Sequence, residues 1–248
     1  MRVIGFLLFG CLLLTGLPAA AQSPERLSAT DVSPPVWGVL EVPQGPGPHP
    51  GVVILPGAAG WRPLYAEVAK AFADSGFVTL ALDYYAETGG AAIGSDEKLR
   101  KWPTWKATVR NAVEYLKGLP TVANRPVGLV GYSRGAFLAV SVASSALGVQ
   151  AVVDFFGGGG GGTDSLEQEV RGFPPLLILH GDADEVVPVG FAETLRDAVV
   201  AQGGQVEIHI YSDVGHAFNA PGASTYSESA AVDAFRRTVE FLRRRVAD

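Results

Sequence analysis

The fold is decided by residues 127–140, VGLVGYSRGAFLAV. The apolar run Val127–Val130 is typical of a buried strand, and Ala136–Ala146 has the pattern of a helix. Between them, Gly131–Gly135 fits G-x-S-x-G, a pattern whose serine lies on a tight strand-to-helix turn with its hydroxyl exposed. The glycines on either side let neighbouring backbone approach closely. The stretch therefore predicts a strand–turn–helix unit that presents Ser133 as a nucleophile.

Strand and helix patterns alternate on both sides of this unit. The further expected strands are Val36–Val42, Gly51–Leu55, Phe77–Leu82, Val149–Phe155, Pro175–Leu179 and Val206–Tyr211. The further expected helices are Leu64–Ser75, Ala107–Lys117, Phe191–Gln202 and Ser227–Arg245. Such alternation predicts one α/β domain over residues 22–248, with a mainly parallel central sheet and helices on both faces. Ligands of such sheets bind at the carboxyl ends of the strands.

Two segments interrupt the alternation. Six glycines, Gly157–Gly162, follow a predicted strand, and a run without side chains is costly to order. We expect a flexible surface loop there, with a mobile rim of the site as the alternative. The segment Glu87–Lys101 is expected to be a surface loop, with a short lid as the alternative.

Composition and charge narrow the class of partner. The 248 residues carry a formal net charge of −6, and no basic patch is expected that could follow a phosphate backbone. Nucleic acid is therefore not expected as a partner. No histidine pair or carboxylate cluster has the spacing of metal ligands, so neither a metal nor a cofactor is expected. The sequence does not indicate an oligomeric state.

The amino terminus has the pattern of an export signal. Arg2 precedes the apolar run Val3–Leu17, and small residues then lead to a cleavage site after Ala21. Residues 1–21 are therefore expected to be removed, which makes the protein periplasmic or extracellular, with no stable membrane insertion. The alternatives are an uncleaved membrane anchor and a lipoprotein signal at Cys11, the only cysteine.

A serine nucleophile requires a base, and the sequence offers four histidines. His49 lies in a Pro/Gly-rich turn, and His209 lies within a strand pattern. His180 opens the loop after a strand and is expected to shape that loop. His216 lies on a loop between the last strand and the last helix, from which it can reach the serine. His216 is therefore the expected base.

The base in turn needs an acidic partner that orients it. The loop after the strand Pro175–Leu179 supplies Asp182, Asp184 and Glu185. Asp184 is preferred, with Asp182 as the main alternative and Asp154 as a weaker one. The order serine, acid, histidine is the one expected for a G-x-S-x-G elbow in an α/β fold.

With these residues in place, the chain resembles the α/β-hydrolase superfamily and, within it, the dienelactone hydrolase-like family. The matching stretches are Leu55–Gly60, Leu82–Tyr85, Gly131–Gly135, His180–Pro188 and Gly215–Phe218. The resemblance implies that the acid is the aspartate of Gly-x-x-Asp-x-x-Val-Pro, which is Asp184.

The chain departs from the family pattern at two positions. Dienelactone hydrolases typically use cysteine where this sequence has Ser133, and they carry an acidic residue where it has Gly57. Both departures argue against a dienelactone as the substrate. Neither changes the predicted triad of Ser133, Asp184 and His216. Serine relatives of the family are similar to general carboxylesterases, so the resemblance implies a small-molecule ester or lactone as substrate.

An oxyanion formed at Ser133 requires two backbone donors. The residue after the nucleophile, Arg134, supplies one N–H, and the resemblance places the other at Ala58 in the loop after the first core strand. The Arg134 side chain is expected to form a salt bridge at the elbow, with steering of an acidic substrate as the alternative. Several aromatic residues near strand ends are expected to belong to the core, with the wall of an acyl pocket as the alternative, namely Trp61, Tyr84, Tyr85, Phe155, Phe156 and Phe218.

The sequence thus predicts a carboxylic ester hydrolase that forms an acyl-enzyme. A peptidase or amidase with the same triad is one rival, although an ester leaves more easily than an amide. A non-catalytic binding protein of the same fold is the other, because fold alone does not determine function.

Overall fold

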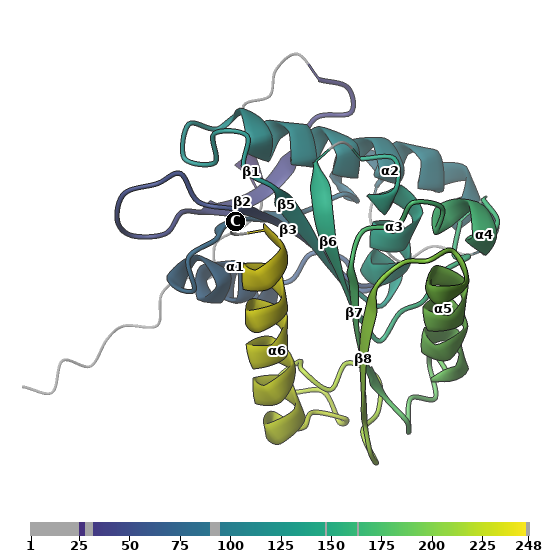
Figure 1. The fold of residues 1–248 in the computed structure, drawn as a ribbon. Coiled ribbons are helices and arrows are strands. Elements are labelled where there is room, and N and C mark those ends of the chain that lie inside the picture. Colours follow the sequence, from purple (N-terminus) through teal and green to yellow (C-terminus); the bar gives the residue numbers. More distant parts are fainter. Residues whose placement is uncertain (1–24, 28–31, 90–94, 147, 163, 247–248) are drawn as a thin grey trace, which may run out of the picture.

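The computed structural model describes residues 25–27, 32–89, 95–146, 148–162 and 164–246. It contains one eight-stranded sheet in the order β1-β2-β4-β3-β5-β6-β7-β8 (Figure 1). The strands are β1 (Glu25–Arg26), β2 (Trp37–Glu41), β3 (Gly51–Leu55), β4 (Val78–Leu82), β5 (Val127–Tyr132), β6 (Val149–Phe155), β7 (Leu176–Gly181) and β8 (Val206–Tyr211). Only β2 is antiparallel to its neighbours, and every other neighbouring pair is parallel. The predicted mainly parallel sheet is confirmed.

Helices cover both faces of the sheet (Figure 1). They are α1 (Leu64–Asp74), the 3₁₀ turn η1 (Ala86–Thr88), α2 (Ser95–Gly118), α3 (Arg134–Ala143), α4 (Leu166–Glu169), α5 (Gly190–Ala201) and α6 (Glu228–Val246). Side chains of α1 and α6 share one buried apolar cluster with the sheet, and those of α2, α3 and α5 share the other. Strands β3 and β5 are apolar and buried along their whole length because they lie at the centre of the sheet, covered on both faces.

The parallel strands direct the loops that follow them to one edge of the sheet. The loops after β3, β5, β7 and β8 begin at that edge, and they carry all five predicted site residues. This is the edge at which open α/β sheets bind their ligands.

Helix α2 begins earlier than the sequence predicts. It runs for 24 residues from Ser95, although Pro103 lies inside it. A proline removes one backbone hydrogen bond from a helix, which favours a helix that starts after it. The side chains of Trp102 and Trp105 are almost fully buried, and this packing holds the turn on either side of the proline. The expected surface loop is therefore wrong for residues 95–101, and residues 90–94 lie outside the described residues.

The glycine run is packed against helices, contrary to the expected flexible surface loop. A Cβ atom added at Gly162 would lie 2.0 Å from Trp102 Nε1, and one added at Gly157 would lie 2.4 Å from Ala136 Cβ. The Gly157 amide also donates to Asp154 Oδ1 at 2.7 Å. Side chains at Gly157 and Gly162 would collide with α3 and α2, whereas Gly160 is exposed and a Cβ there would meet nothing closer than 3.9 Å.

The predicted signal sequence, residues 1–21, lies outside the described residues. Among the helices that the structure does describe, none combines the length and apolar character needed to cross a membrane.

Candidate active site

Ser133 lies on the turn between β5 and α3. Its backbone has φ 52° and ψ −119°, a conformation that costs a non-glycine residue about 1–3 kcal/mol. The turn is tight because its glycines touch backbone: a Cβ at Gly135 would lie 2.2 Å from the Leu55 carbonyl oxygen, and one at Gly131 would lie 2.4 Å from Ala136 Cα. The structure thus has the strand–turn–helix unit that the sequence predicts.

His216 follows β8 and faces the serine. Its Nε2 lies 3.0 Å from Ser133 Oγ. The Phe156 ring stands edge-on to the imidazole at a centroid distance of 4.9 Å, and the Thr225 hydroxyl donates to the His216 carbonyl. These contacts hold the ring at the carboxyl edge of the sheet, 83 residues from the serine in sequence.

Asp184 lies on the other side of the imidazole. Its Oδ2 is 2.7 Å from His216 Nδ1, and its side chain is fully buried. Its Oδ1 accepts two backbone hydrogen bonds, from Val186 N at 2.9 Å and Val187 N at 2.8 Å. A carboxylate at Nδ1 keeps the proton on that nitrogen, so Nε2 is left to accept the serine proton.

The two alternative acids have other partners. Asp182 Oδ1 accepts the backbone N–H of Asp213 at 2.7 Å. Asp154 is fully buried beside Gly157, and burial raises its pKa to about 7, although the backbone amides of Gly157 and Gly158 act in the opposite direction. The structure therefore brings Asp184, not Asp182 or Asp154, to His216.

His180, which the sequence assigns to loop shape, lies beneath the same loop. Its Nε2 lies 2.8 Å from the Val187 carbonyl oxygen and 3.5 Å from Asp184 Oδ2. The hydrogen bond from His180 to the Val187 carbonyl closes the loop in which the N–H groups of Val186 and Val187 donate to Asp184. His180 thus fixes the loop that carries the acid.

The predicted oxyanion donors lie on either side of the serine. Arg134 is the first residue of α3, and the N–H groups of a first helical turn point out of the helix end. Ala58 follows β3 and lines a cavity of about 290 Å³ together with Ser133 and His216. The remaining wall is mostly apolar and includes Leu64, Val68, Phe156 and Ala217, with Arg62 and Asn219 as polar members.

The Arg134 side chain extends from the elbow towards the tyrosines that follow β4. Its guanidinium hydrogen-bonds to the Tyr85 hydroxyl. Position 57 faces the nucleophile: a Cβ at Gly57 would lie 3.5 Å from Ser133 Cβ, which is ordinary contact. A Cβ atom would fit there, and this sequence has none.

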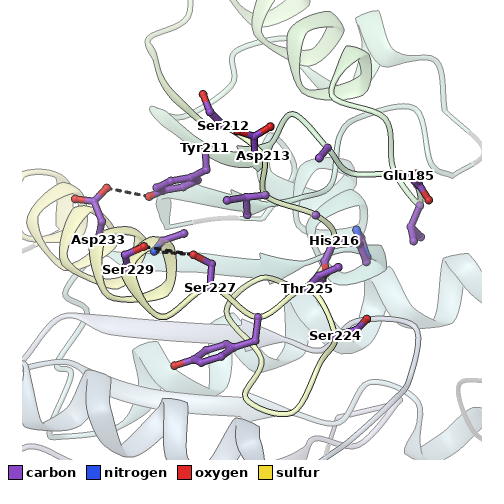
Figure 2. Close-up of a pocket in the computed structure, with 16 residues that line it drawn as sticks. Glu185, Tyr211, Ser212, Asp213, His216, Ser224, Thr225, Ser227, Ser229 and Asp233 are labelled. Atoms are coloured by element: carbon purple, nitrogen blue, oxygen red, sulfur yellow. Dashed lines mark hydrogen bonds between the residues drawn. The ribbon is translucent and has the colours of Figure 1, made fainter.

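A second, larger hollow lies on the far side of His216. Figure 2 shows it between the loop after β8 and the start of α6, with a volume of about 890 Å³. Hydroxyl groups of Ser224, Thr225 and Ser227 line it, and Tyr211 donates to Asp233 at 3.0 Å on one wall. The two hollows meet at Val186 and His216, but Ser133 lines only the smaller one. The Ser133 side chain is therefore reached through the smaller cavity.

Sequence reasoning left three tyrosines out of the site. The Gly57 N–H donates to the Tyr65 hydroxyl at 2.9 Å, and the Tyr84 and Tyr85 hydroxyls donate to the Pro56 and Gly57 carbonyls at 2.8 and 3.1 Å. The available signal was position: Tyr84 and Tyr85 come just after a buried strand, at the edge where the site lies. Phe156 was also assigned to the core, yet it lines the cavity.

The chain is similar in sequence and in fold to known proteins. The carboxymethylenebutenolidase of Pseudomonas putida is 28% identical over 234 residues, which cover 88% of this chain and 95% of that protein. The structure is similar to that of a putative dienelactone hydrolase from Klebsiella pneumoniae, with a TM-score of 0.76, 20% identity and coverage of 88% of this chain and 97% of that one. It is also similar to an esterase of Thermogutta terrifontis, with a TM-score of 0.65, 18% identity and coverage of 90% and 94%.

These likenesses extend over the whole α/β domain. The model of the dienelactone hydrolase family matches residues 36–246, a range that includes every strand from β2 to β8 and all five predicted site residues. The chain belongs to the dienelactone hydrolase family, within the α/β-hydrolase superfamily.

Proposed function

We propose that this protein is a serine hydrolase that cleaves carboxylic esters or lactones through an acyl-enzyme on Ser133. The observation that carries the proposal is the chain of contacts from Ser133 Oγ to His216 Nε2 at 3.0 Å and from His216 Nδ1 to Asp184 Oδ2 at 2.7 Å. This is the arrangement by which a base activates a hydroxyl nucleophile. The relative named carboxymethylenebutenolidase supports the same class of reaction.

The first half of the reaction forms the acyl-enzyme. As Ser133 Oγ attacks the carbonyl carbon, His216 Nε2 takes the hydroxyl proton, and the carbonyl oxygen becomes an oxyanion. When that oxygen re-forms its double bond, the bond to the leaving oxygen breaks, and His216 returns its proton to the leaving alcohol. The buried Asp184 carboxylate stabilises the imidazolium that exists between these two steps.

The second half releases the acid. Water takes the place of the alcohol, His216 removes one of its protons, and the hydroxyl oxygen attacks the acyl carbon. Collapse of the second oxyanion breaks the bond to Ser133 Oγ, which recovers the proton from His216. For a lactone, the alcohol and acid belong to one molecule, and the product is a hydroxy acid.

The oxyanion is assigned to the backbone N–H groups of Arg134 and Ala58. Removal of one such donor typically costs a factor of about 10²–10³ in kcat. The mostly apolar wall of the cavity favours an uncharged acyl group, and its volume of about 290 Å³ favours a small one.

Replacement of the nucleophile tests the proposal. Ser133→Ala is expected to lower kcat on a model ester by a factor of about 10⁴ or more and to abolish labelling by a fluorophosphonate probe. Ser144→Ala is the matched control, because its hydroxyl bonds to the Glu169 carbonyl beyond the far end of α3. Labelling and ester hydrolysis that persist in Ser133→Ala would refute the assignment.

The same assay separates the rival functions. A peptidase or amidase would hydrolyse an amide at least as well as the ester with the same acyl group, whereas an esterase prefers the ester. A binding protein would give neither turnover nor labelling. A series of esters of increasing acyl length, with a dienelactone included, would identify the substrate class that fits the cavity.

Export is proposed on the sequence pattern of residues 1–21. Amino-terminal sequencing of the protein recovered from a periplasmic or extracellular fraction is expected to begin at Gln22. Recovery of the intact chain in the membrane fraction would favour an anchor instead.

A further inference from the structure

The loop after β3 is held by hydroxyl groups on both sides of its backbone. Its Pro56 carbonyl accepts from Tyr84 Oη at 2.8 Å, and the N–H of Gly57 donates to Tyr65 Oη at 2.9 Å. These two groups belong to one peptide unit, which is planar. Both ends of that unit are therefore fixed by side chains that come from other elements.

The next peptide unit is the one that carries the predicted oxyanion donor. The carbonyl of Gly57 and the N–H of Ala58 share a plane and point in opposite directions because the peptide is trans. That carbonyl accepts from Tyr85 Oη at 3.1 Å and from the Gly60 N–H at 3.0 Å. Whatever fixes the direction of the Gly57 carbonyl also fixes the direction of the Ala58 N–H.

The Tyr84 and Tyr85 hydroxyls form a small network of their own. Tyr84 Oη lies 2.6 Å from Tyr85 Oη as well as 2.8 Å from the Pro56 carbonyl oxygen, so its one proton is shared between these two acceptors, and both side chains are almost fully buried. Burial raises the pKa of Tyr85 to about 12 and raises that of Tyr84 above its ordinary value, so both hydroxyls keep their protons at neutral pH. The Arg134 guanidinium hydrogen-bonds to Tyr85, which leaves the Tyr85 proton available to an acceptor.

Rigid aromatic packing supports the two hydroxyls. The Tyr84 and Tyr85 rings lie 4.0 Å apart, and the Trp105 ring stands edge-on to both at 5.5 and 5.1 Å. Trp105 is itself tied to Thr88 Oγ1 by its Nε1 at 2.9 Å. Trp105 of helix α2 thus gives the two tyrosine rings a fixed packing partner.

We propose that Tyr84 and Tyr85 are positioning residues, whose hydroxyls orient the peptide units of Pro56–Ala58 so that the Ala58 N–H is aimed at the oxyanion. The inference rests on the proposed function, because it concerns the same reaction. It assigns to these tyrosines no contact with the substrate. Their effect passes through the backbone, and it appears only when a negative charge develops on the carbonyl oxygen.

Removal of each hydroxyl tests this role. Tyr85→Phe and Tyr84→Phe are expected to lower kcat on a model ester about 10- to 100-fold, with KM within about twofold of the wild type. The expected loss in kcat is smaller than for removal of an oxyanion donor, because the Ala58 N–H is still present and is only turned away from the oxyanion. Binding of a trifluoromethyl ketone with the same acyl group, which forms a tetrahedral adduct, should weaken by the same factor as kcat/KM. Rates are expressed per site titrated to completion with a fluorophosphonate, so that unfolded protein does not count.

Tyr211→Phe is the matched control. Its hydroxyl donates to Asp233 on α6, away from the loop after β3, and its loss is expected to leave both kcat and adduct affinity unchanged. The proposal is overturned if Tyr85→Phe and Tyr84→Phe keep the wild-type kcat, or if kcat falls while affinity for the tetrahedral adduct does not. Failure of the wild type to be labelled at Ser133 would overturn the proposed function as well, so the two failures are distinguishable.

Discussion

Two histidines contact the same carboxylate oxygen of Asp184, and only one of them also contacts Ser133 Oγ. His216 Nδ1 lies 2.7 Å from Asp184 Oδ2, and His180 Nε2 lies 3.5 Å from the same atom. The His216 side chain is 16% exposed, whereas the His180 side chain is fully buried. The two residues come from the loop after β8 and the end of β7, so one carboxylate joins two neighbouring segments.

The difference lies in the other partner of each ring. His216 presents its second nitrogen to Ser133 Oγ, but His180 donates its Nε2 proton to the neutral Val187 carbonyl at 2.8 Å. Its Nδ1 is buried and has no hydrogen-bond partner among the described residues. Burial holds the pKa of His180 below its ordinary value, in spite of the Val187 carbonyl and the Asp184 carboxylate. Because the charged form of His180 is disfavoured, His216 is the ring whose positive charge the Asp184 carboxylate can stabilise.

The comparison shows that nearness to a carboxylate does not make a histidine a base. A base also needs a nitrogen directed at the proton it removes, and that direction comes from the loop on which it lies. His180 is fixed within a strand end, and its free nitrogen faces the interior. His216 lies beyond the strand end, where the reacting groups meet.

Removal of the base should give the largest effect. His216→Ala is expected to lower kcat about 10⁴- to 10⁶-fold, because the serine hydroxyl then has no acceptor for its proton. The fold should persist, since the side chain is partly exposed, and far-UV circular dichroism checks this. Steady-state hydrolysis of a model ester measures the loss. A variant that retains more than about one hundredth of the wild-type kcat would remove His216 from the mechanism.

Neutralisation of the shared carboxylate should give the next largest effect. Asp184→Asn is expected to lower kcat about 10⁴-fold, because an amide at Nδ1 permits the wrong tautomer of His216. Asp182→Asn is the matched control on the same loop, and its kcat is expected to stay within about threefold of the wild type. If the two variants lost activity equally, the choice between the two acids would be wrong.

The different roles expected for His180 and His216 could be predicted from where each residue lies along the chain. Ser133 was found from a strand, a glycine-flanked turn and a helix, and Asp184 and His216 follow from the order of loops along the chain. Each of these residues lies just beyond a buried apolar strand, and the carboxyl ends of parallel strands meet. The fold and the meeting of the triad side chains could therefore be predicted without any distance.

What the sequence could not provide is packing between elements distant along the chain. The start of α2 depends on burial of Trp102, which outweighs the break that Pro103 predicts. Gly157 and Gly162 are packed because side chains of α3 and α2 lie too close for a Cβ, and no composition rule contains that information. The role of Tyr85 depends on which carbonyl its hydroxyl meets, 28 residues away in sequence.

The smallest effect concerns His180, and it appears in stability rather than in activity. A histidine whose pKa is lower in the folded state binds fewer protons than it does in the unfolded chain. The free energy of unfolding therefore falls as pH drops through about 6.5, the ordinary pKa, towards the lower pKa of the folded state. His180→Gln retains an N–H for the Val187 carbonyl and does not titrate. Urea denaturation at pH 7.5 and 5.5 should show a greater loss for the wild type than for the variant.

Activity of this variant separates the two histidines. Because His180 holds only the loop behind the acid, kcat of His180→Gln at pH 7.5 is expected to fall by less than about tenfold, far from the loss in His216→Ala. His209→Gln serves as the control for titration, since its side chain is 34% exposed and solvent weakens its coupling to folding. If His180→Gln lost activity as severely as His216→Ala, with its stability intact, the buried ring would have to take part in proton transfer, and the division between the two histidines would be refuted.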